Sequence, residues 1–369
     1  MAHTISPSAR VRKSPFYDAT VADGVVSFTV YNRMLMPTGY GDPEAEYRRL
    51  IEGVSMWDVA VERQVEIAGP DAERLTQILV PRRIDKMPLN MGWYVPVCDH
   101  RGVVLNDPIL LKVADDRFWL SIADSDILFW ARAIAGERGL NVRITEPDVS
   151  PLAIQGPKAE DVVAAMFGED IRALRYFRFR EVELDGIPLQ LARSGWSKQG
   201  GFELYLMDGT RGTDLWEHVK AAGAPFGIGP GNPNPMERIE SGLLSWGADT
   251  DDETNPYEIR MGSYIDLDCP DDTIGIKALR RLQERGPKRH QIGIVMDIDG
   301  HLNAGDGQPR IFKGASDVGC VTSPGWSPRL KSNIGIALAW TGVGPGDQVH
   351  VAFEDGRECK GEAVTLPFL

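Results

Sequence analysis

Apolar and polar positions alternate over short stretches of the chain, and this pattern predicts a mixed fold of short strands and helices. Residues 64–68 alternate as a strand that turns Val65 and Ile67 to one face. Apolar positions then recur at helical spacing as far as Leu79, and Asp71 stands where an N-terminal cap is expected. The pattern therefore predicts a strand, a Gly-Pro turn and a helix in direct succession.

The same succession occurs a second time. Ile67-Ala-Gly-Pro-Asp-Ala-Glu73 and Ile154-Gln-Gly-Pro-Lys-Ala-Glu160 share their apolar, Gly-Pro and Ala-Glu positions. Gly-Pro is also a common turn between a strand and a helix, so chance similarity is an open alternative. Two copies predict two pseudo-symmetric α+β subdomains and not a solenoid, which needs more repeats.

Further apolar runs predict the remaining elements. Helices are expected at residues 125–140 with Ser125 as cap, 213–222, 235–246 with Pro235 in the first turn, and 276–285 before Gly286-Pro287. Strands are expected at residues 291–296, 319–322, 334–340 and 348–353. The last group predicts a small all-β domain at the C-terminal end.

Charge and composition narrow the classes of function. The 369 residues include 40 Lys+Arg and 53 Asp+Glu, a formal net charge of −13. An acidic balance argues against binding to nucleic acid or to anionic membranes. No apolar run reaches the length of a membrane span, and residues 1–13 are not followed by the apolar segment of a secretory signal. We therefore expect a soluble, cytoplasmic protein.

Cysteine and histidine residues do not form a recognisable metal or redox motif. Cys98, Cys269, Cys320 and Cys359 are far apart, which predicts reduced, buried thiols and no metal site. The segment 227–232 lacks the third glycine of a dinucleotide-binding loop, and residues 195–199 lack a glycine of the hydrolase nucleophile motif. Neither motif predicts a function.

Four ordered motifs resemble the glycine-cleavage T-protein (aminomethyltransferase) superfamily, which binds tetrahydrofolate. They are Met56-Trp-Asp-Val59, Gly102-Val-Val-Leu-Asn-Asp107, Ser194-Gly-Trp-Ser197 with Gly201-Phe-Glu-Leu204, and Thr322-Ser-Pro-Gly-Trp-Ser-Pro328. The turn 155–157 and Arg238-Ile-Glu240 extend the similarity. Each motif alone is weak, but their order along residues 25–355 is specific.

Within this superfamily the chain looks closest to the dimethylsulfoniopropionate demethylases. The similarity lies in Thr29–Thr38, Leu105–Pro108, Ile122–Asp126 and Ser197–Glu203. It implies methyl transfer from the sulfonium to tetrahydrofolate, giving methylmercaptopropionate and 5-methyltetrahydrofolate. The implied fold is an α+β, three-domain cloverleaf around a central folate channel. Two interleaved subdomains would occupy residues 1–284, and a β-barrel residues 285–369.

The resemblance also assigns residues to the folate. Glu203 matches the glutamate that binds the pterin, whose adjacent N–H and amino groups suit one carboxylate. Trp196 matches an aromatic position that could cover the folate, and Asp107 matches an acidic position facing its reactive end. Asp107 is thus the expected catalytic residue, orienting the pterin or accepting a proton. An exposed strand glutamate, a core tryptophan and a turn aspartate are the structural alternatives.

The sulfonium needs a different kind of site, because it is positively charged and has no hydrogen to donate. Aromatic faces attract such cations, and the candidates beside the motifs are Tyr31, Tyr94, Phe177, Trp196 and Tyr205. Of these, we assign Tyr94, Phe177 and Tyr205 to the folate side, Tyr31 to the substrate, and Trp196 to both. Asn32 and Arg33 are added as substrate-binding residues, Arg33 for the propionate carboxylate, with a surface arginine as its alternative.

Two departures from the T-protein pattern favour demethylation over glycine cleavage. Asn106-Asp107 stands where that pattern has paired aspartates, and residues 232–236 replace its Arg-Asp pair. An aminomethyltransferase with a lipoylated carrier and a non-catalytic folate-binding protein remain alternatives, as does an N-methyl betaine as methyl donor. A homodimer is one assembly compatible with the sequence, which does not fix the oligomeric state.

Overall fold

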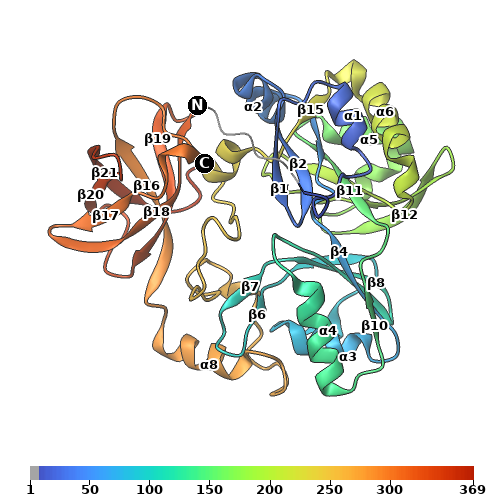
Figure 1. The fold of residues 1–369 in the computed structure, drawn as a ribbon, viewed down its shortest axis with the longest axis horizontal. Coiled ribbons are helices and arrows are strands. Elements are labelled where there is room, and N and C mark those ends of the chain that lie inside the picture. Colours follow the sequence, from blue (N-terminus) through green and yellow to red (C-terminus); the bar gives the residue numbers. More distant parts are fainter. Residues whose placement is uncertain (1–7) are drawn as a thin grey trace. The chain divides into compact units, whose positions relative to one another are not determined.

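The computed structural model describes residues 8–369, which form two compact units (Figure 1). One unit holds the chain up to Ala72 with Met87–Trp93 and Ile109–Asn234, and the other holds Glu73–Lys86, Tyr94–Pro108 and Pro235–Leu369. Each unit is therefore built from separate stretches of chain. The expected division at residues 284/285 stays a prediction. Of residues 1–13, in which we expect no secretory signal, the first seven lie outside the described part.

A six-stranded sheet forms the centre of the first unit. Its order is β12 (Phe179–Leu184), β13 (Ile187–Ala192), β14 (Gly201–Leu206), β11 (Ser150–Gln155), β3 (Ser55–Asp58) and β15 (Gly229–Gly231). One face packs against α1 (Tyr17–Ala22), α5 (Ala159–Phe167) and α6 (Gly212–Gly223) through a large apolar cluster, and Figure 1 shows α5 and α6 side by side. The helix predicted at 213–222 is therefore confirmed as α6, one residue longer at each end.

The other face of this sheet meets a five-stranded sheet. That sheet has the order β10 (Arg143–Thr145), β4 (Gln64–Ala68), β9 (Arg117–Ser121), β8 (Ile109–Ala114) and β5 (Met91–Tyr94). Leu111 and Trp119 from it pack against Phe179, Ala192 and Tyr205. The same unit contains the hairpin of β1 (Ser27–Tyr31) and β2 (Met34–Gly39), and also α2 (Pro43–Glu52) and α4 (Ile127–Arg138).

The two Gly-Pro turns have the same conformation. Gly69 and Gly156 have φ of +128° and +124°, and each carbonyl accepts a hydrogen bond of 3.0 Å from the alanine three residues later. The first turn joins β4 to α3 (Ala72–Leu79), and the second joins β11 to α5. The predicted repeat is thus structural, although its two strands belong to different sheets.

One predicted cap is wrong, and the Asp71 cap stays a prediction. The N-cap position of α4 is held by Asp126 and not by Ser125, and the Asp126 carboxylate pairs with Arg33 and Arg63. The Asp71 carboxylate accepts a hydrogen bond from the Asn141 backbone N–H. Each carboxylate therefore binds a segment of the chain that is distant from it in sequence.

A closed barrel dominates the second unit and confirms the predicted C-terminal β domain. Its order is β16 (Arg289–Asp297), β19 (Ser332–Trp340), β18 (Ser316–Ser327), β17 (Arg310–Lys313), β20 (Gln348–Ala352) and β21 (Glu358–Val364). The sequence pattern missed β17 and β21 and predicted only the middle of β18. This unit also holds the short hairpin of β6 (Val97–Cys98) and β7 (Val104–Asn106).

The helix predicted at residues 235–246 is much shorter. α7 spans Pro235–Glu240, while α8 spans Ile276–Arg285 as predicted. Gly242 has φ of +60°. Its N–H donates to the Ile239 carbonyl at 3.0 Å, and the Leu243 N–H donates to the Arg238 carbonyl at 2.8 Å. This pair of hydrogen bonds around a left-handed glycine is the Schellman motif, which ends α7 here.

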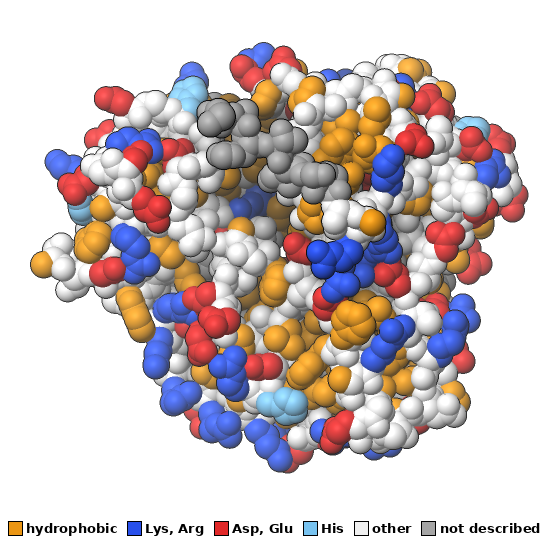
Figure 2. Space-filling model, in the orientation of Figure 1, with side chains coloured by type: hydrophobic (Ala, Val, Ile, Leu, Met, Phe, Trp, Pro, Cys, Tyr) orange, Lys and Arg blue, Asp and Glu red, His pale blue; other side chains and the backbone are white. Residues whose placement is uncertain are grey.

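Cys98, Cys269 and Cys359 are buried, as predicted, whereas Cys320 is partly exposed. Within residues 8–369, no helix has the length and apolar character needed to cross a bilayer. The same residues contain no group of three or more His, Cys, Asp or Glu side chains arranged for a metal ion. Figure 2 shows acidic and basic side chains interspersed on the visible face.

Candidate functional site

Glu203 lies on the six-stranded sheet, on the face away from the helices. It is 6% exposed, and its neighbours across the sheet are Ala153 on β11 and Ala192 on β13. The hydroxyl of Ser194 donates a short hydrogen bond to Glu203 Oε2, and the Tyr205 hydroxyl donates to the same oxygen at 3.2 Å. Burial raises the pKa of Glu203, while the two hydroxyl donors lower it. The alternative of an exposed strand glutamate is therefore wrong.

Tyr205 connects Glu203 to the five-stranded sheet. Its hydroxyl is hydrogen-bonded to Ser121, which accepts a hydrogen bond from Gln64 Nε2 at 2.9 Å. Burial, followed by the negative charge of Glu203, raises the pKa of Tyr205 well above its ordinary value. Tyr205 therefore stays a neutral hydrogen-bond donor near physiological pH.

Phe177 adopts an unusual backbone conformation near the same end of the sheet. Its φ is +62°, a left-handed value that costs a bulky residue about 1–2 kcal/mol. The strained residue is held by hydrogen bonds from its own N–H to the Arg193 carbonyl at 2.8 Å, and from the Gly92 N–H to its carbonyl at 2.7 Å. Such strain is found at functional sites, where the surroundings fix a side chain in an otherwise unfavourable place.

Trp196 lies in the loop between β13 and β14 and is partly exposed. The segment Ser194–Gly201 holds most of this loop; Ser194 is the hydrogen-bond donor to Glu203, and Gly201, the first residue of β14, lies two residues before Glu203. The structure therefore brings Phe177, Trp196, Glu203 and Tyr205 to one region of the first unit.

Tyr94 and Asp107 form a pair in the second unit. The Tyr94 hydroxyl donates to Asp107 Oδ2 at 2.6 Å. Burial raises the pKa of Asp107 to about 7, and the hydrogen bond from Tyr94 opposes part of that rise. A carboxyl group that titrates near neutral pH can take up or release a proton under working conditions.

Two further residues surround Tyr94 that the sequence did not suggest. The Tyr264 ring meets the Tyr94 ring edge-on, with centroids 5.1 Å apart. Arg82 donates from Nη1 to the Tyr94 carbonyl at 3.0 Å, and its guanidinium lies 5.7 Å from the Tyr264 ring centre. Arg82 and Tyr264 stand outside every motif of the resemblance, so no sequence signal marked them.

Three of the four residues predicted to bind substrate lie at the β1–β2 hairpin, Tyr31 at the end of β1 and Asn32 and Arg33 in the turn. Asn32 and Arg33 have φ of +47° and +61°. The Asn32 side chain is buried and donates to three backbone carbonyls, including that of Val61 at 3.0 Å. Arg33 is exposed and pairs with Asp126 at 2.5 Å, while Tyr31 packs against the apolar cluster of the first unit. The Asn32 amide thus links the hairpin turn to the backbone at Val61 and at residues 122–123.

Several motif residues of the resemblance have structural partners. Asp58, in the first motif, accepts a hydrogen bond from Ser14 at 2.5 Å, and burial raises its pKa to about 6. Thr322 and Ser323, in the last motif, donate to Asp249 at 2.7 and 2.6 Å, and Arg238 donates to the same carboxylate at 2.6 Å. These contacts join the barrel strand β18 to the segment after α7.

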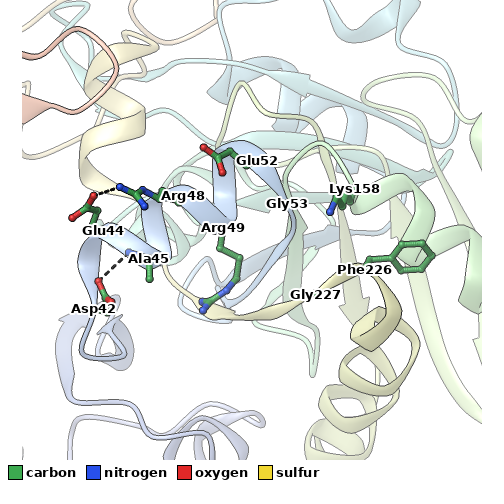
Figure 3. Close-up of a pocket in the computed structure, with 10 residues that line it drawn as sticks. All are labelled: Asp42, Glu44, Ala45, Arg48, Arg49, Glu52, Gly53, Lys158, Phe226 and Gly227. Carbon is green, nitrogen blue, oxygen red and sulfur yellow. Dashed lines mark hydrogen bonds and ion pairs between the residues drawn. The ribbon is translucent and has the colours of Figure 1, made fainter.

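A surface hollow of about 610 Å³ lies beside α2 and contains no predicted site residue (Figure 3). Its cations are Arg48, Arg49 and Lys158. Arg48 pairs with Glu44, and Arg49 donates to the Pro230 carbonyl at 2.7 Å. Since Asp42 and Glu52 also line it, this hollow has no clear preference for one sign of charge.

Comparison with protein-family models matched almost the whole chain. The GCVT N-terminal domain matches residues 16–269, and the glycine cleavage T-protein C-terminal barrel domain matches residues 289–369. Among solved structures, the glycine cleavage system aminomethyltransferase T from Bartonella henselae has a TM-score of 0.83 at 20% identity, covering 97% of this chain and 98% of its own. That likeness establishes the fold.

Two relatives with different names differ in their similarity to the chain. Dimethylsulfoniopropionate demethylase DmdA from Ruegeria pomeroyi is 44% identical over 358 residues, which cover 96% of each chain. An aminomethyltransferase from Shouchella clausii is 30% identical over 344 residues, covering 90% of this chain and 91% of its own.

Proposed function

The chain belongs to the glycine cleavage T-protein family of tetrahydrofolate-dependent transferases, and on that premise we propose that it transfers a methyl group from dimethylsulfoniopropionate to tetrahydrofolate. The products would be methylmercaptopropionate and 5-methyltetrahydrofolate. The observation that carries the proposal is the 44% identity to the Ruegeria demethylase along 96% of both chains.

Glu203 is the residue that we assign to the pterin. A carboxylate accepts hydrogen bonds only, and a pterin offers two neighbouring N–H donors that one carboxylate can bind together. Ser194 and Tyr205 both donate to Oε2 and so hold the carboxylate in one orientation without adding a competing charge. The donor and acceptor chemistry of these residues therefore suits a pterin ring.

Asp107 is the residue that we assign to the reactive end of the folate. In the reaction the N5–methyl bond forms as the methyl–sulfur bond breaks, the bonding pair stays on sulfur, and N5 loses its proton. Asp107 has a pKa near 7 and can accept that proton directly or through water. Tyr94 holds the carboxylate in place through the 2.6 Å hydrogen bond.

The sulfonium end would be held by aromatic faces and not by hydrogen bonds. Each desolvated face contributes on the order of 0.5–2 kcal/mol toward a cation. Trp196 and Tyr31 are our candidates on the substrate side, and Arg33 is the candidate for the propionate. Because Arg33 already pairs with Asp126, a substrate carboxylate would have to share or displace that partner. A direct displacement needs no covalent intermediate, so alignment of the reacting groups is the main contribution.

The test is a comparison of methyl and aminomethyl donors. Purified protein is incubated with tetrahydrofolate and, separately, dimethylsulfoniopropionate, glycine betaine or an aminomethyl-lipoyl carrier protein. We expect 5-methyltetrahydrofolate from the sulfonium alone. Methylenetetrahydrofolate from the carrier, with no product from the sulfonium, would replace the proposal by an aminomethyltransferase.

Two structural features bear on that alternative. Asn106 is buried where the T-protein pattern has an aspartate. Asn232, within the segment that replaces the Arg-Asp pair, donates to Glu46 at 3.1 Å. These substitutions remove charged groups that glycine cleavage uses on an amine. The cytoplasmic location and the homodimer remain predictions.

A further inference from the structure

Gln155 occupies an unusual place at the end of β11. It is 0% exposed and is the strand partner of Gly201, the first residue of β14. A Cβ atom added to Gly201 would overlap the Gln155 amide, and so would one added to Gly195 in the preceding loop. The two glycines therefore leave a slot that the side chain of Gln155 fills.

The Gln155 side chain in this slot forms hydrogen bonds with two residues of the loop between β13 and β14. Its Nε2 donates to the Ser194 carbonyl at 3.1 Å, and its Oε1 accepts from the Ser197 hydroxyl at 2.8 Å. The Gly156 N–H adds a hydrogen bond of 2.9 Å to the Gly200 carbonyl. Trp196 lies between the two bonded serines, and the hydroxyl of Ser194 is the donor to Glu203.

The internal repeat indicates that this arrangement is specific to one copy. The two Gly-Pro turns have nearly identical φ at Gly69 and Gly156. At the preceding position the first copy has Ala68, and the second has Gln155. The turn itself therefore does not require glutamine, and the side chain in the second copy needs another reason.

We propose that Gln155 is a positioning residue that fixes the Ser194–Gly201 loop, so that Trp196 and the Ser194–Glu203 pair are in place before tetrahydrofolate binds. This inference rests on the proposed function. Preorganisation of this kind lowers the cost of ordering the loop on binding. Loss of Gln155 is thus expected to affect folate affinity more than the rate of the bound complex.

Gly201→Ala and Gln155→Ala together provide the sharpest test. Gly201 does not have a left-handed φ, so an added methyl group is opposed mainly by the Gln155 side chain. Each single variant should raise the tetrahydrofolate Kd about tenfold, the size expected when one or two hydrogen bonds are lost. The double variant should bind no more weakly than Gln155→Ala, because the obstacle is gone. A double variant that binds tetrahydrofolate clearly more weakly than Gln155→Ala overturns the inference, because the added methyl group would then act without the Gln155 side chain.

Controls separate positioning from loss of stability. Gln155→Met keeps the length of the side chain without its hydrogen bonds and should also weaken folate binding. Gly136→Ala, on α4, adds a methyl group in open space and should leave the Kd unchanged. At saturating folate, the kcat of Gln155→Ala and of Gln155→Met should stay within about twofold of the wild type, since the expected effect lies in folate binding. Wild-type affinity in both Gln155→Ala and Gln155→Met contradicts the inference.

Hydrogen exchange of the ligand-free protein distinguishes failure of this inference from failure of the proposed function. Gln155→Ala should speed amide exchange in residues 194–201 and leave β12 unchanged. If the wild-type protein does not bind tetrahydrofolate, the proposed function fails, and the exchange result still decides whether Gln155 holds the loop. Unchanged exchange in that loop rejects the positioning role.

Discussion

At the scale of single residues, Glu203 is a buried carboxylate held by two hydroxyl groups and not by a cation. We predict that Glu203→Gln raises the tetrahydrofolate Kd about 10- to 100-fold, because charge-assisted hydrogen bonds contribute about 1.5–3 kcal/mol. Isothermal titration with each protein measures this change. Glu183→Gln, on the exposed part of β12, is the matched control and should bind like the wild type. Equal affinity of Glu203→Gln and wild type would remove Glu203 from the pterin site.

The Tyr94–Asp107 pair leads to a prediction about pH. The Tyr94 hydroxyl stabilises the charged form of Asp107, whose pKa is about 7. Tyr94→Phe removes this donor, so the pKa of Asp107 should rise and the corresponding inflection in kcat/KM should move about one pH unit higher. Asp107→Asn should abolish the inflection. A profile that keeps its inflection in Asp107→Asn would assign the titration to another group.

Residue roles were only partly predictable. Resemblance to the family pointed to Glu203 and Asp107, but their hydrogen-bond partners come from other strands and turns. The motif predicts Asn32 as a substrate ligand, and this role stays a prediction; its amide donates to the backbone carbonyls of Val61 and Ile122, which the motif does not indicate. Gln155 lies inside a recognised turn, yet its contact with Gly195, 40 residues later in the chain, depends on the pairing of β11 with β14.

At the scale of elements, Gly242 decides where α7 ends. Its left-handed φ of +60° costs a residue with a side chain about 1–2 kcal/mol. We therefore predict that Gly242→Ala lowers the free energy of unfolding by about that amount, measured by urea denaturation. An added Cβ would also lie 3.3 Å from Leu366 and Pro367. The matched control Gly136→Ala, in an exposed helix, should be neutral or raise stability by up to about 1 kcal/mol.

The predicted boundaries of α7 and β18 differ from the structure, for a local reason in α7 and a long-range reason in β18. The apolar spacing of residues 235–246 continues past Gly242, so periodicity alone extended α7. β18 runs from Ser316 through Pro324 and Gly325, residues that ordinarily indicate a turn. Pairing with β19, in which Pro324 is opposite Gly335 and Gly325 is opposite Ile334, keeps this part of the strand extended. By contrast, β4 and α8 matched their predicted residues, because local signals mark both ends.

At the scale of the whole molecule, two buried acids shape the pH dependence of stability. Burial raises the pKa of Asp58 to about 6 and that of Asp107 to about 7. Between the ordinary pKa of an aspartate, about 4, and these values the folded state binds more protons than the unfolded state. The free energy of unfolding should therefore fall as pH rises from about 4 to about 7.

Asn variants test this contribution separately for each acid. Asp58→Asn should remove a decrease on the order of 3 kcal/mol, centred between pH 4 and 6, since each pKa unit corresponds to about 1.4 kcal/mol. Asp107→Asn should flatten the curve up to about pH 7. Urea denaturation at several pH values measures both slopes. Slopes that remain as steep as in the wild type would show that other groups titrate.

The net charge of the chain indicates less about its function and site residues than the ordered motifs do. A value of −13 argues against nucleic acid, and on the visible face acidic and basic side chains are interspersed. The local carboxylates that matter here, Glu203 and Asp107, were found through their motifs. Charge counting cannot find them, because burial and hydroxyl donors determine how these two groups titrate.

The six-stranded sheet ends in β12 on one side and β15 on the other, and both edges resist further strand pairing. β15 consists of Gly229-Pro230-Gly231, in which the proline has no N–H to donate. β12 carries Arg180, Glu181 and Glu183 along its length. These two edges thus disfavour fibre-like growth of the six-stranded sheet, and a second copy of the chain is not expected to associate by adding a strand to it.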